Sequence, residues 1–223
     1  MRSTRLRSRS GQLPGIAAAL AMGGLALGAD YLWGRFKRTG ARHPEALSDG
    51  AAHFATGLAV ALPAAPFVRE PGRFLMIAGL SSILIDLDHV AAARSLRLVP
   101  CMTMPQRPPT HSVLAVGALT YLIERLQPGR QTELAVTLGL GSHLLRDLIT
   151  GGAPLFMPGR IVEVARHHGL LMTVGLAALG RWYARKILDP ARPRRSNPAV
   201  LAPEALVVRA RAMRAARQAR RAA

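Results

Sequence analysis

Six uncharged, apolar runs account for most of the chain between its two ends. They cover residues 13–29, 51–68, 74–85, 113–123, 134–145 and 169–180, and short links containing proline or arginine separate them. None of the runs shows the strict alternation of apolar and polar residues that is typical of half-buried strands. The pattern therefore predicts an all-α protein.

The lengths of these runs bear on whether they cross a membrane. A helix needs about 20 apolar residues to span a bilayer, and the first two runs meet this requirement alone. The others meet it if their polar residues lie at helix ends or face inward. We therefore predict a multi-pass transmembrane helical bundle of about five or six membrane segments. Two alternatives stay open: a soluble bundle of buried core helices, and a cleavable signal peptide in residues 1–29.

Charge is concentrated at the two ends of the chain. The 223 residues carry a formal net charge of +18, of which residues 1–12 and 181–223 supply +14, whereas residues 50–180 are nearly balanced. Basic tails beside an apolar body are typical of membrane orientation and of attraction to anionic lipids. Aromatic residues make up 4% of the chain, too few for the base-stacking surfaces of nucleic-acid-binding proteins. The expected partners are the lipid bilayer, with anionic lipids at the C-terminal tail, and no nucleic acid.

The same distribution suggests three regions and an orientation. Residues 1–48 hold the basic N-terminus and the first membrane segment, residues 49–183 form a membrane-embedded domain, and residues 184–223 form a basic tail. Residues 204–221 are rich in Ala and Arg, which suits either a peripheral helix on anionic lipid or a solvated tail. Six crossings would place both ends in the cytoplasm of a cell with an inner membrane. Four basic residues in the expected loop after the first run oppose this orientation: Arg35, Lys37, Arg38 and Arg42.

Several ionisable residues interrupt the apolar body, and each is a functional hypothesis because charge is costly in a membrane. They fall into four clusters at the edges of the runs: His53; Asp86, Asp88 and His89; Thr110, His111 and Ser112; and His143 and Asp147. Residues three or four positions apart share one face of a helix. Asp86 can therefore meet His89, and His143 can meet Asp147.

Helix direction brings the clusters together. Consecutive spanning helices alternate in direction, so the start of the second run, the end of the third, the start of the fourth and the end of the fifth lie at one membrane face. We expect the four clusters to form one polar layer there.

Imidazole and carboxylate groups in such a layer suit Zn²⁺, Mn²⁺ or Fe²⁺, and we expect a divalent ion, Zn or Mn in the first place. The candidate ligands are His53, Asp86, Asp88, His89, His111, His143 and Asp147. A bound metal lowers the pKa of water and so permits hydrolysis at neutral pH. The catalytic candidates are Asp88, a general base if it is not a ligand; Arg107, which either holds an anionic group or snorkels to the interface; and Thr110, a supporting or capping hydroxyl. For His53, a structural hydrogen bond is the alternative to metal binding.

These motifs resemble the YdjM-like family of predicted inner-membrane metal-dependent hydrolases over about residues 50–160. The shared pieces are His53-x-x-x-Gly57, Asp-Leu-Asp-His at 86–89, Arg-x-x-Thr-His-Ser at 107–112 and Ser-His-Leu-Leu-Arg-Asp-Leu-Ile-Thr-x-Gly from residue 142. This chain has Ile85 where the family usually has Pro, and Gln106 and Pro108 where it usually has His and Gly around the Arg. The resemblance implies that residues 49–183 form a metal-dependent hydrolase-like domain in an inner membrane.

The leading hypothesis is a membrane-bound metal-dependent hydrolase that uses metal-activated water at this layer. A lipid-like molecule or a phosphate ester that reaches the site along the bilayer is the favoured class of substrate. A transporter or ion relay using the same residues is the main alternative, although transporters favour ionisable groups near the midplane and internal repeats. A non-catalytic membrane scaffold is a third possibility.

Overall fold

The computed structural model describes residues 13–104, 107–126, 129–156 and 160–189. Helices dominate these residues, and the prediction of an all-α fold is confirmed for them. The helices are α1 (Leu13–Thr39), α2 (Arg42–Ala61), η2 (Ala65–Phe67), α3 (Pro71–Leu84), η3 (Ile85–Leu87), α4 (Asp88–Ala93), α5 (Leu98–Met102), α6 (Val113–Leu126), α7 (Arg130–Thr150), α8 (Arg166–Tyr183) and the π-helical turn η4 (Ala184–Leu188). The predicted helix at residues 204–221 lies outside the described residues.

Helix α1 is longer than the apolar run that predicts it. The helix continues through Trp33 and Lys37 and ends before Gly40, whose φ of 73° favours glycine. Lys37 and Arg38 lie in its last turn, where the helix dipole favours cations. The expectation that Arg35, Lys37 and Arg38 lie in a loop is therefore wrong, and so is the same expectation for Arg42, the first residue of α2.

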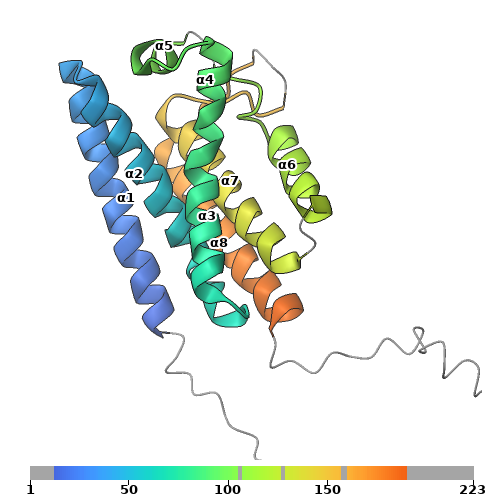
Figure 1. The fold of residues 1–223 in the computed structure, drawn as a ribbon. Coiled ribbons are helices and arrows are strands. Elements are labelled where there is room, and N and C mark those ends of the chain that lie inside the picture. Colours follow the sequence, from blue (N-terminus) through green and yellow to red (C-terminus); the bar gives the residue numbers. More distant parts are fainter. Residues whose placement is uncertain (1–12, 105–106, 127–128, 157–159, 190–223) are drawn as a thin grey trace, which may run out of the picture. The chain divides into compact units, whose positions relative to one another are not determined.

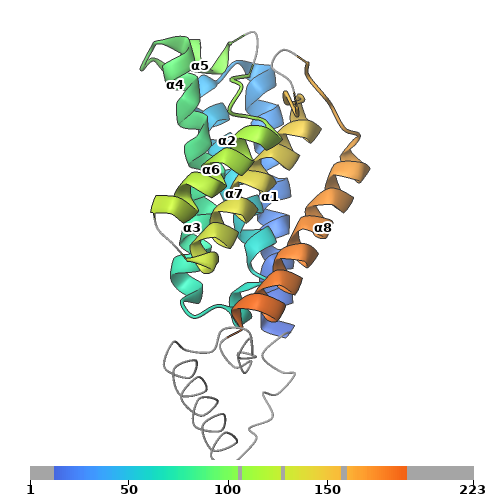
Figure 2. The same ribbon diagram turned by 90° about the vertical axis from the view of Figure 1, so that its right-hand side faces the viewer.

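The six long helices of the described chain form an up-and-down bundle (Figures 1 and 2). Helices α1, α3 and α7 run toward one end, and α2, α6 and α8 begin there. The short helices α4 and α5 lie at this same end, which we call the site end. Helix α1 begins and α8 finishes at the opposite end.

Helix α7 is central to the packing and contacts α2, α3, α6 and α8. Its Leu134 and Leu138 are buried against Phe74 of α3 and Val60 of α2 in the half of the bundle away from the site end. Glycines let the helices approach closely: a Cβ on Gly139 would collide with the carbonyl oxygen of Ala78. This contact between α3 and α7 holds the ends of these two helices at a fixed distance from each other.

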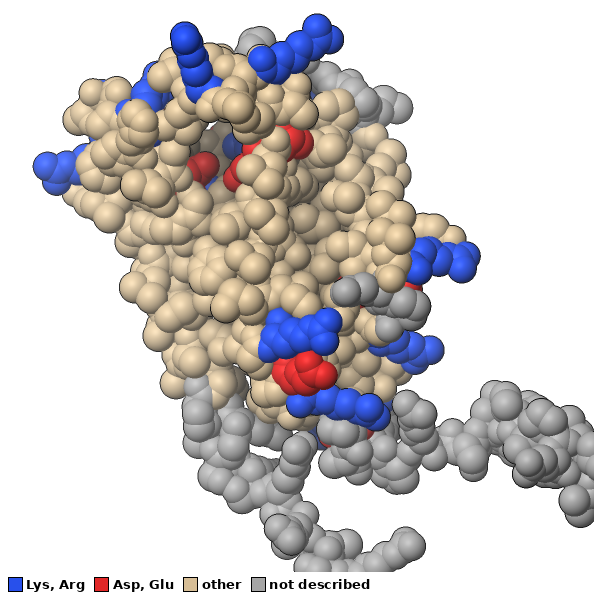
Figure 3. Space-filling view, viewed as in Figure 1, with Lys and Arg blue, Asp and Glu red and all other residues tan. Residues whose placement is uncertain are grey.

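The outer surface of the bundle is rich in apolar side chains. Leu20 of α1, Leu122 of α6 and Leu171 of α8 expose 73%, 49% and 68% of their surface. On the face shown in Figure 3, most charged side chains lie near the two ends, with a largely uncharged band between them. Two helical stretches, Gly15–Thr39 and Pro71–Ala93, are long and apolar enough to cross a membrane.

The close approach of α3 and α7 yields a first prediction. Gly139→Ala should lower the midpoint of thermal unfolding in detergent, because overpacking of a filled interface costs about 1–3 kcal/mol. The matched control is Gly117→Ala in α6, where a Cβ would meet nothing within 4 Å. An unchanged midpoint for Gly139→Ala would show that α3 and α7 do not pack as closely as described.

Candidate metal centre

Four elements deliver the predicted ligands to the site end of the bundle. Helix α2 supplies His53, the η3–α4 turn supplies Asp86, Asp88 and His89, the segment before α6 supplies His111, and α7 supplies His143 and Asp147. The structure brings all seven into one cluster, with three histidines and Asp147 nearly inaccessible to solvent. The alternating helix directions account for this convergence.

His143 is held with one ring nitrogen facing the acidic groups. Its Nδ1 donates a hydrogen bond of 2.7 Å to the carbonyl of Ser82, so the lone pair lies on Nε2. That Nε2 lies 3.1 Å from Asp147 Oδ2 and 3.6 Å from Asp86 Oδ1, and it has no hydrogen-bond partner among the described residues. Either a proton on Nε2 or a metal ion between these groups would make this arrangement favourable.

Four ligand atoms form a closed ring around this position. His111 Nε2 lies 3.2 Å from Asp86 Oδ1 and 3.7 Å from Asp147 Oδ2, and His143 Nε2 closes the ring through the same two oxygens. Zinc bonds of about 2.0–2.1 Å at tetrahedral angles place neighbouring ligand atoms about 3.3 Å apart. The four ring distances lie on both sides of this value, which is compatible with a divalent ion. The groups of residues whose ligand atoms all lie close to one another hold these histidines with either Asp86 or Asp147, not with both.

His111 is held between two carboxylates. Its Nδ1 lies 3.1 Å from Asp88 Oδ2, and its Nε2 lies 3.2 Å from Asp86 Oδ1. Burial alone would lower the pKa of His111, but the hydrogen bonds to Asp86 and Asp88 outweigh it and raise the pKa to about 9. Thr110 donates a hydrogen bond to the same Asp88 oxygen. Asp88 therefore lies behind His111, in the position of a carboxylate that orients a metal-binding imidazole.

His89 and His53 lie on either side of the ring. Three groups of three residues have ligand atoms close enough for one ion: His53, Asp86 and His143; Asp86, His89 and His111; and His111, His143 and Asp147. The first two groups share Asp86, so this carboxylate can bridge two ions. Asp88 belongs to none of the three groups.

His53 also has contacts that a metal would not require. Its Nε2 lies 2.7 Å from a guanidinium nitrogen of Arg146, and its ring stacks on His143 with centroids 3.8 Å apart. Because Arg146 can only donate, His53 Nε2 accepts this hydrogen bond. The structural alternative for His53 is therefore supported by a specific contact, and the ring helps to orient His143.

Arg146 is the functional-site residue that the sequence analysis missed. Its side chain is 3% exposed and binds Asp30 of α1 at 2.6 and 2.8 Å and Asp49 of α2 at 2.7 Å. Arg146 lies three positions after His143, and Asp30 is the first acidic residue of the chain, at the end of its first apolar run. Helical spacing from His143 was a usable signal for Arg146 itself, but not for its pairing with Asp30 and Asp49.

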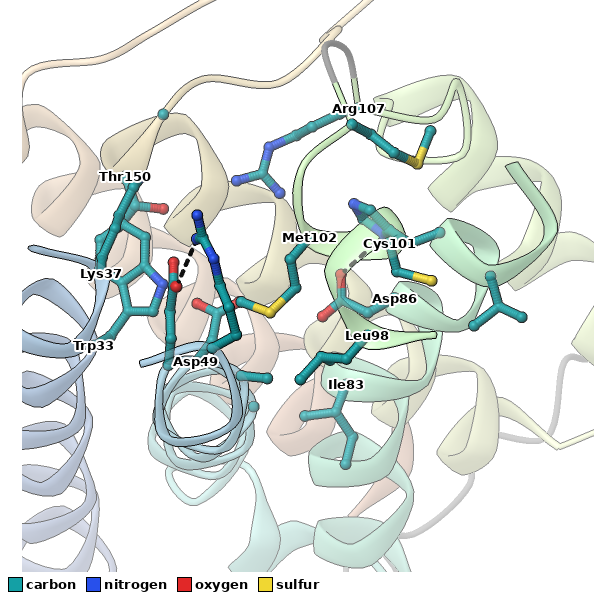
Figure 4. A pocket seen from close by; sticks show the side chains of 18 of the residues that line it. Trp33, Lys37, Asp49, Ile83, Asp86, Leu98, Cys101, Met102, Arg107 and Thr150 are labelled. Carbon is teal, nitrogen blue, oxygen red and sulfur yellow. Dashed lines mark hydrogen bonds and ion pairs between the residues drawn. The ribbon is translucent and has the colours of Figure 1, made fainter. Parts of the chain in front are cut away.

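The cluster opens into a cavity of about 580 Å³. Asp86, His89 and Arg107 line it, and Arg107 binds Asp147 Oδ2 at 2.6 Å. Figure 4 shows Asp49, Asp86 and Arg107 on different sides of this space, with Leu98 and Met102 of α5 between them. The hollow is visible near the site end in Figure 3, with acidic and basic side chains around it. Of the four ring residues, Asp86 lines this cavity, so the ring meets the cavity at this carboxylate.

The remaining sequence candidates lie outside the cluster. His43, His167 and His168 are exposed and belong to no metal-binding group of the described residues. Ser112 caps α6 by accepting a hydrogen bond of 3.2 Å from the backbone of Ala115. Gln106 lies outside the described residues.

The candidate ligands lie within the part of the chain that matches a known protein family. The family described as YdjM inner membrane protein matches residues 49–166, which include every residue of the ligand ring. The chain belongs to the YdjM family. A relative of this YdjM-family chain, Transmembrane protein 267 from Mus musculus, is 29% identical over 121 residues, which are 50% of this chain and 56% of that protein. The match thus spans little more than half of the relative's length, and no solved structure matches the chain.

The protonation of His111 yields a second prediction. With a pKa of about 9, His111 carries a proton at pH 7, which a metal ion at Nε2 must displace. The affinity for Zn²⁺ should therefore rise with pH up to about 9, by as much as about tenfold per pH unit. Calorimetric titrations in two buffers with different protonation enthalpies measure the proton released. The His111→Asn variant should release about one proton fewer, and equal release from both proteins would contradict a metal–His111 bond.

Proposed function

We propose that this YdjM-family protein is a membrane-bound, metal-dependent hydrolase. The observation that carries the proposal is His143, whose unpartnered Nε2 faces Asp86 and Asp147 in a buried ring that opens into a cavity. A structural ion would need no access from outside, whereas catalytic sites keep a position open to water or substrate. The adjoining cavity favours catalysis.

The proposed roles follow from the contacts. Asp86, His111, His143 and Asp147 would hold the ion, which when bound supplies an activated water at neutral pH. Asp88 would keep the His111 ring oriented through Nδ1. Its other oxygen lies 2.9 Å from His89 Nδ1, so Asp88 would hold the His89 ring in place as well.

The position of Arg107 favours an anionic substrate. It lines the cavity, is about a quarter exposed, and already binds one carboxylate oxygen, of Asp147. Guanidinium groups pair with carboxylate and phosphate in the same geometry. A phosphate ester or a lipid-like molecule with such a group is the substrate class that we propose, with Thr110 supporting the site through Asp88.

We further propose that the six long helices cross the inner membrane. Their exposed leucines suit contact with lipid, while their polar side chains gather inside at the site end. An even number of crossings puts the start of α1 and the end of α8 on the same side of the membrane, opposite to the site. The strongly basic ends of the sequence favour the cytoplasm for that side, so the site would face outward.

Metal content provides the third prediction. Purified protein should contain a divalent ion, and His143→Ala and Asp86→Ala should each remove most of it, since both residues belong to the ring. His167→Ala is the control, because this histidine is exposed at the start of α8. Elemental analysis of all four proteins, with circular dichroism to verify folding, measures the effect. Unchanged metal in both ring variants would rule out this site, and ion flux in vesicles without hydrolysis would favour an ion relay instead.

Topology provides the fourth prediction. A reporter enzyme that functions only in the cytoplasm should be active when it is fused after residue 223. A reporter enzyme that functions only outside the cytoplasm should be active when it is inserted after Ser95, between α4 and α5. A C-terminal fusion that is active only outside the cytoplasm would contradict the proposed orientation.

A further inference from the structure

One wall of the cavity comes from α1, outside the region that matches the YdjM family. Trp33 and Lys37 of α1 line the cavity, whereas the family match begins at residue 49. Figure 4 shows both side chains across the cavity from Asp86 and Arg107. The ligand ring belongs to the family region, and this wall is an addition to it.

Helix α1 is fixed firmly enough to form part of a binding site. Asp30, two turns before Lys37, binds the buried Arg146 through two guanidinium nitrogens. The Arg146 guanidinium also lies 5.7 Å from the centroid of the Trp33 ring. The same Arg146 contacts His53 of the cluster, so the position of α1 relative to the cluster is set by direct contacts.

Charge within the cavity leaves Lys37 available to an anion. The lining residue Glu45 is paired with Arg42 at 2.9 Å, and Asp49 is paired with Arg146 at 2.7 Å. No carboxylate of the described residues lies within salt-bridge distance of Lys37, whose ammonium sits 4.6 Å from the centroid of the Trp33 ring. A cation held on an aromatic face keeps its other sides free for a ligand.

The remaining lining makes the cavity amphipathic. Ile83, Val90, Leu98 and Met102 form an apolar side, and the volume of about 580 Å³ lies in the range of ligand pockets. Exposed leucines of α1 place this helix against lipid, and Trp33 with Lys37 follows them near its end, where aromatic and basic residues meet the bilayer surface. In the proposed orientation, basic residues at this outer end run against the usual charge bias, which favours a specific role for Lys37.

We propose that α1 completes the substrate site, with Lys37 and Arg107 binding the phosphate headgroup of a membrane lipid between them. Trp33 and the apolar side of the cavity hold the first carbons of the lipid. The view of this cavity as a substrate site rests on the proposed hydrolase function, but the binding of the headgroup by Lys37 does not require hydrolysis.

Binding to the full-length protein in detergent tests this proposal. The probe is dihexanoyl phosphatidic acid, titrated by calorimetry into metal-loaded protein and into protein treated with a chelator. Lys37→Gln should weaken binding about tenfold in both forms, because one charge-assisted contact is lost. Lys37→Arg should restore most of the affinity. The matched control, Arg38→Gln, changes a neighbouring exposed cation that does not line the cavity and should leave affinity within about twofold.

The outcomes separate this proposal from the proposed function. Equal binding by the Lys37→Gln variant and the unchanged protein would overturn the role of α1. If inorganic phosphate binds as tightly as the lipid probe, the natural ligand is a free phosphate compound, and the assignment to a lipid is overturned. Binding that depends on Lys37, without turnover of any phosphate ester, would support the α1 site while refuting the hydrolase.

Discussion

The buried carboxylate of Asp147 constrains the site end of the bundle more than any other group. It has no access to solvent, and an isolated carboxylate costs several kcal/mol when removed from water, on the order of the stability of a whole domain. Its charge is balanced by Arg107 at 2.6 Å, and the imidazoles of His143 and His53 lie 3.1 and 3.5 Å from it. Because these groups come from different parts of the chain, α2, α7 and the non-helical segment before α6 must converge on one point.

Much of the site could be predicted from helical spacing and direction alone. Asp86 with His89, and His143 with Asp147, meet because residues three or four apart share a helix face, and α3 and α7 both finish at the site end. The distinction between Asp88 and Asp86 could not be predicted, because it depends on the η3 turn. That turn directs Asp86 toward the Nε2 atom of His111 and Asp88 toward its Nδ1 atom.

The network around Arg146 was beyond the reach of local patterns. Arg146 belongs to a motif shared with the family, but its partners Asp30 and Asp49 lie 116 and 97 residues away. The contribution of α1 to the cavity wall could not be predicted from the sequence for a similar reason. By its charge alone, Lys37 is predicted to lie in a basic loop. The continuation of α1 to Thr39 instead brings it beside the cluster. Long-range contacts and helix ends decide these features, and neither has a strong signature in sequence.

The contact between Asp30 and Arg146 has a consequence for biosynthesis. Helix α1 leaves the ribosome long before α7, so Asp30 has no contact with Arg146 until 116 further residues have been made. During that time an acidic group borders an apolar helix with no cation from α7 to balance it. The hairpin of α1 and α2, whose helices contact each other extensively, is the earliest unit able to shield it. The α1–α2 hairpin is therefore available before α7 is made, and α7 then brings both the partner of Asp30 and two residues of the ligand ring, His143 and Asp147.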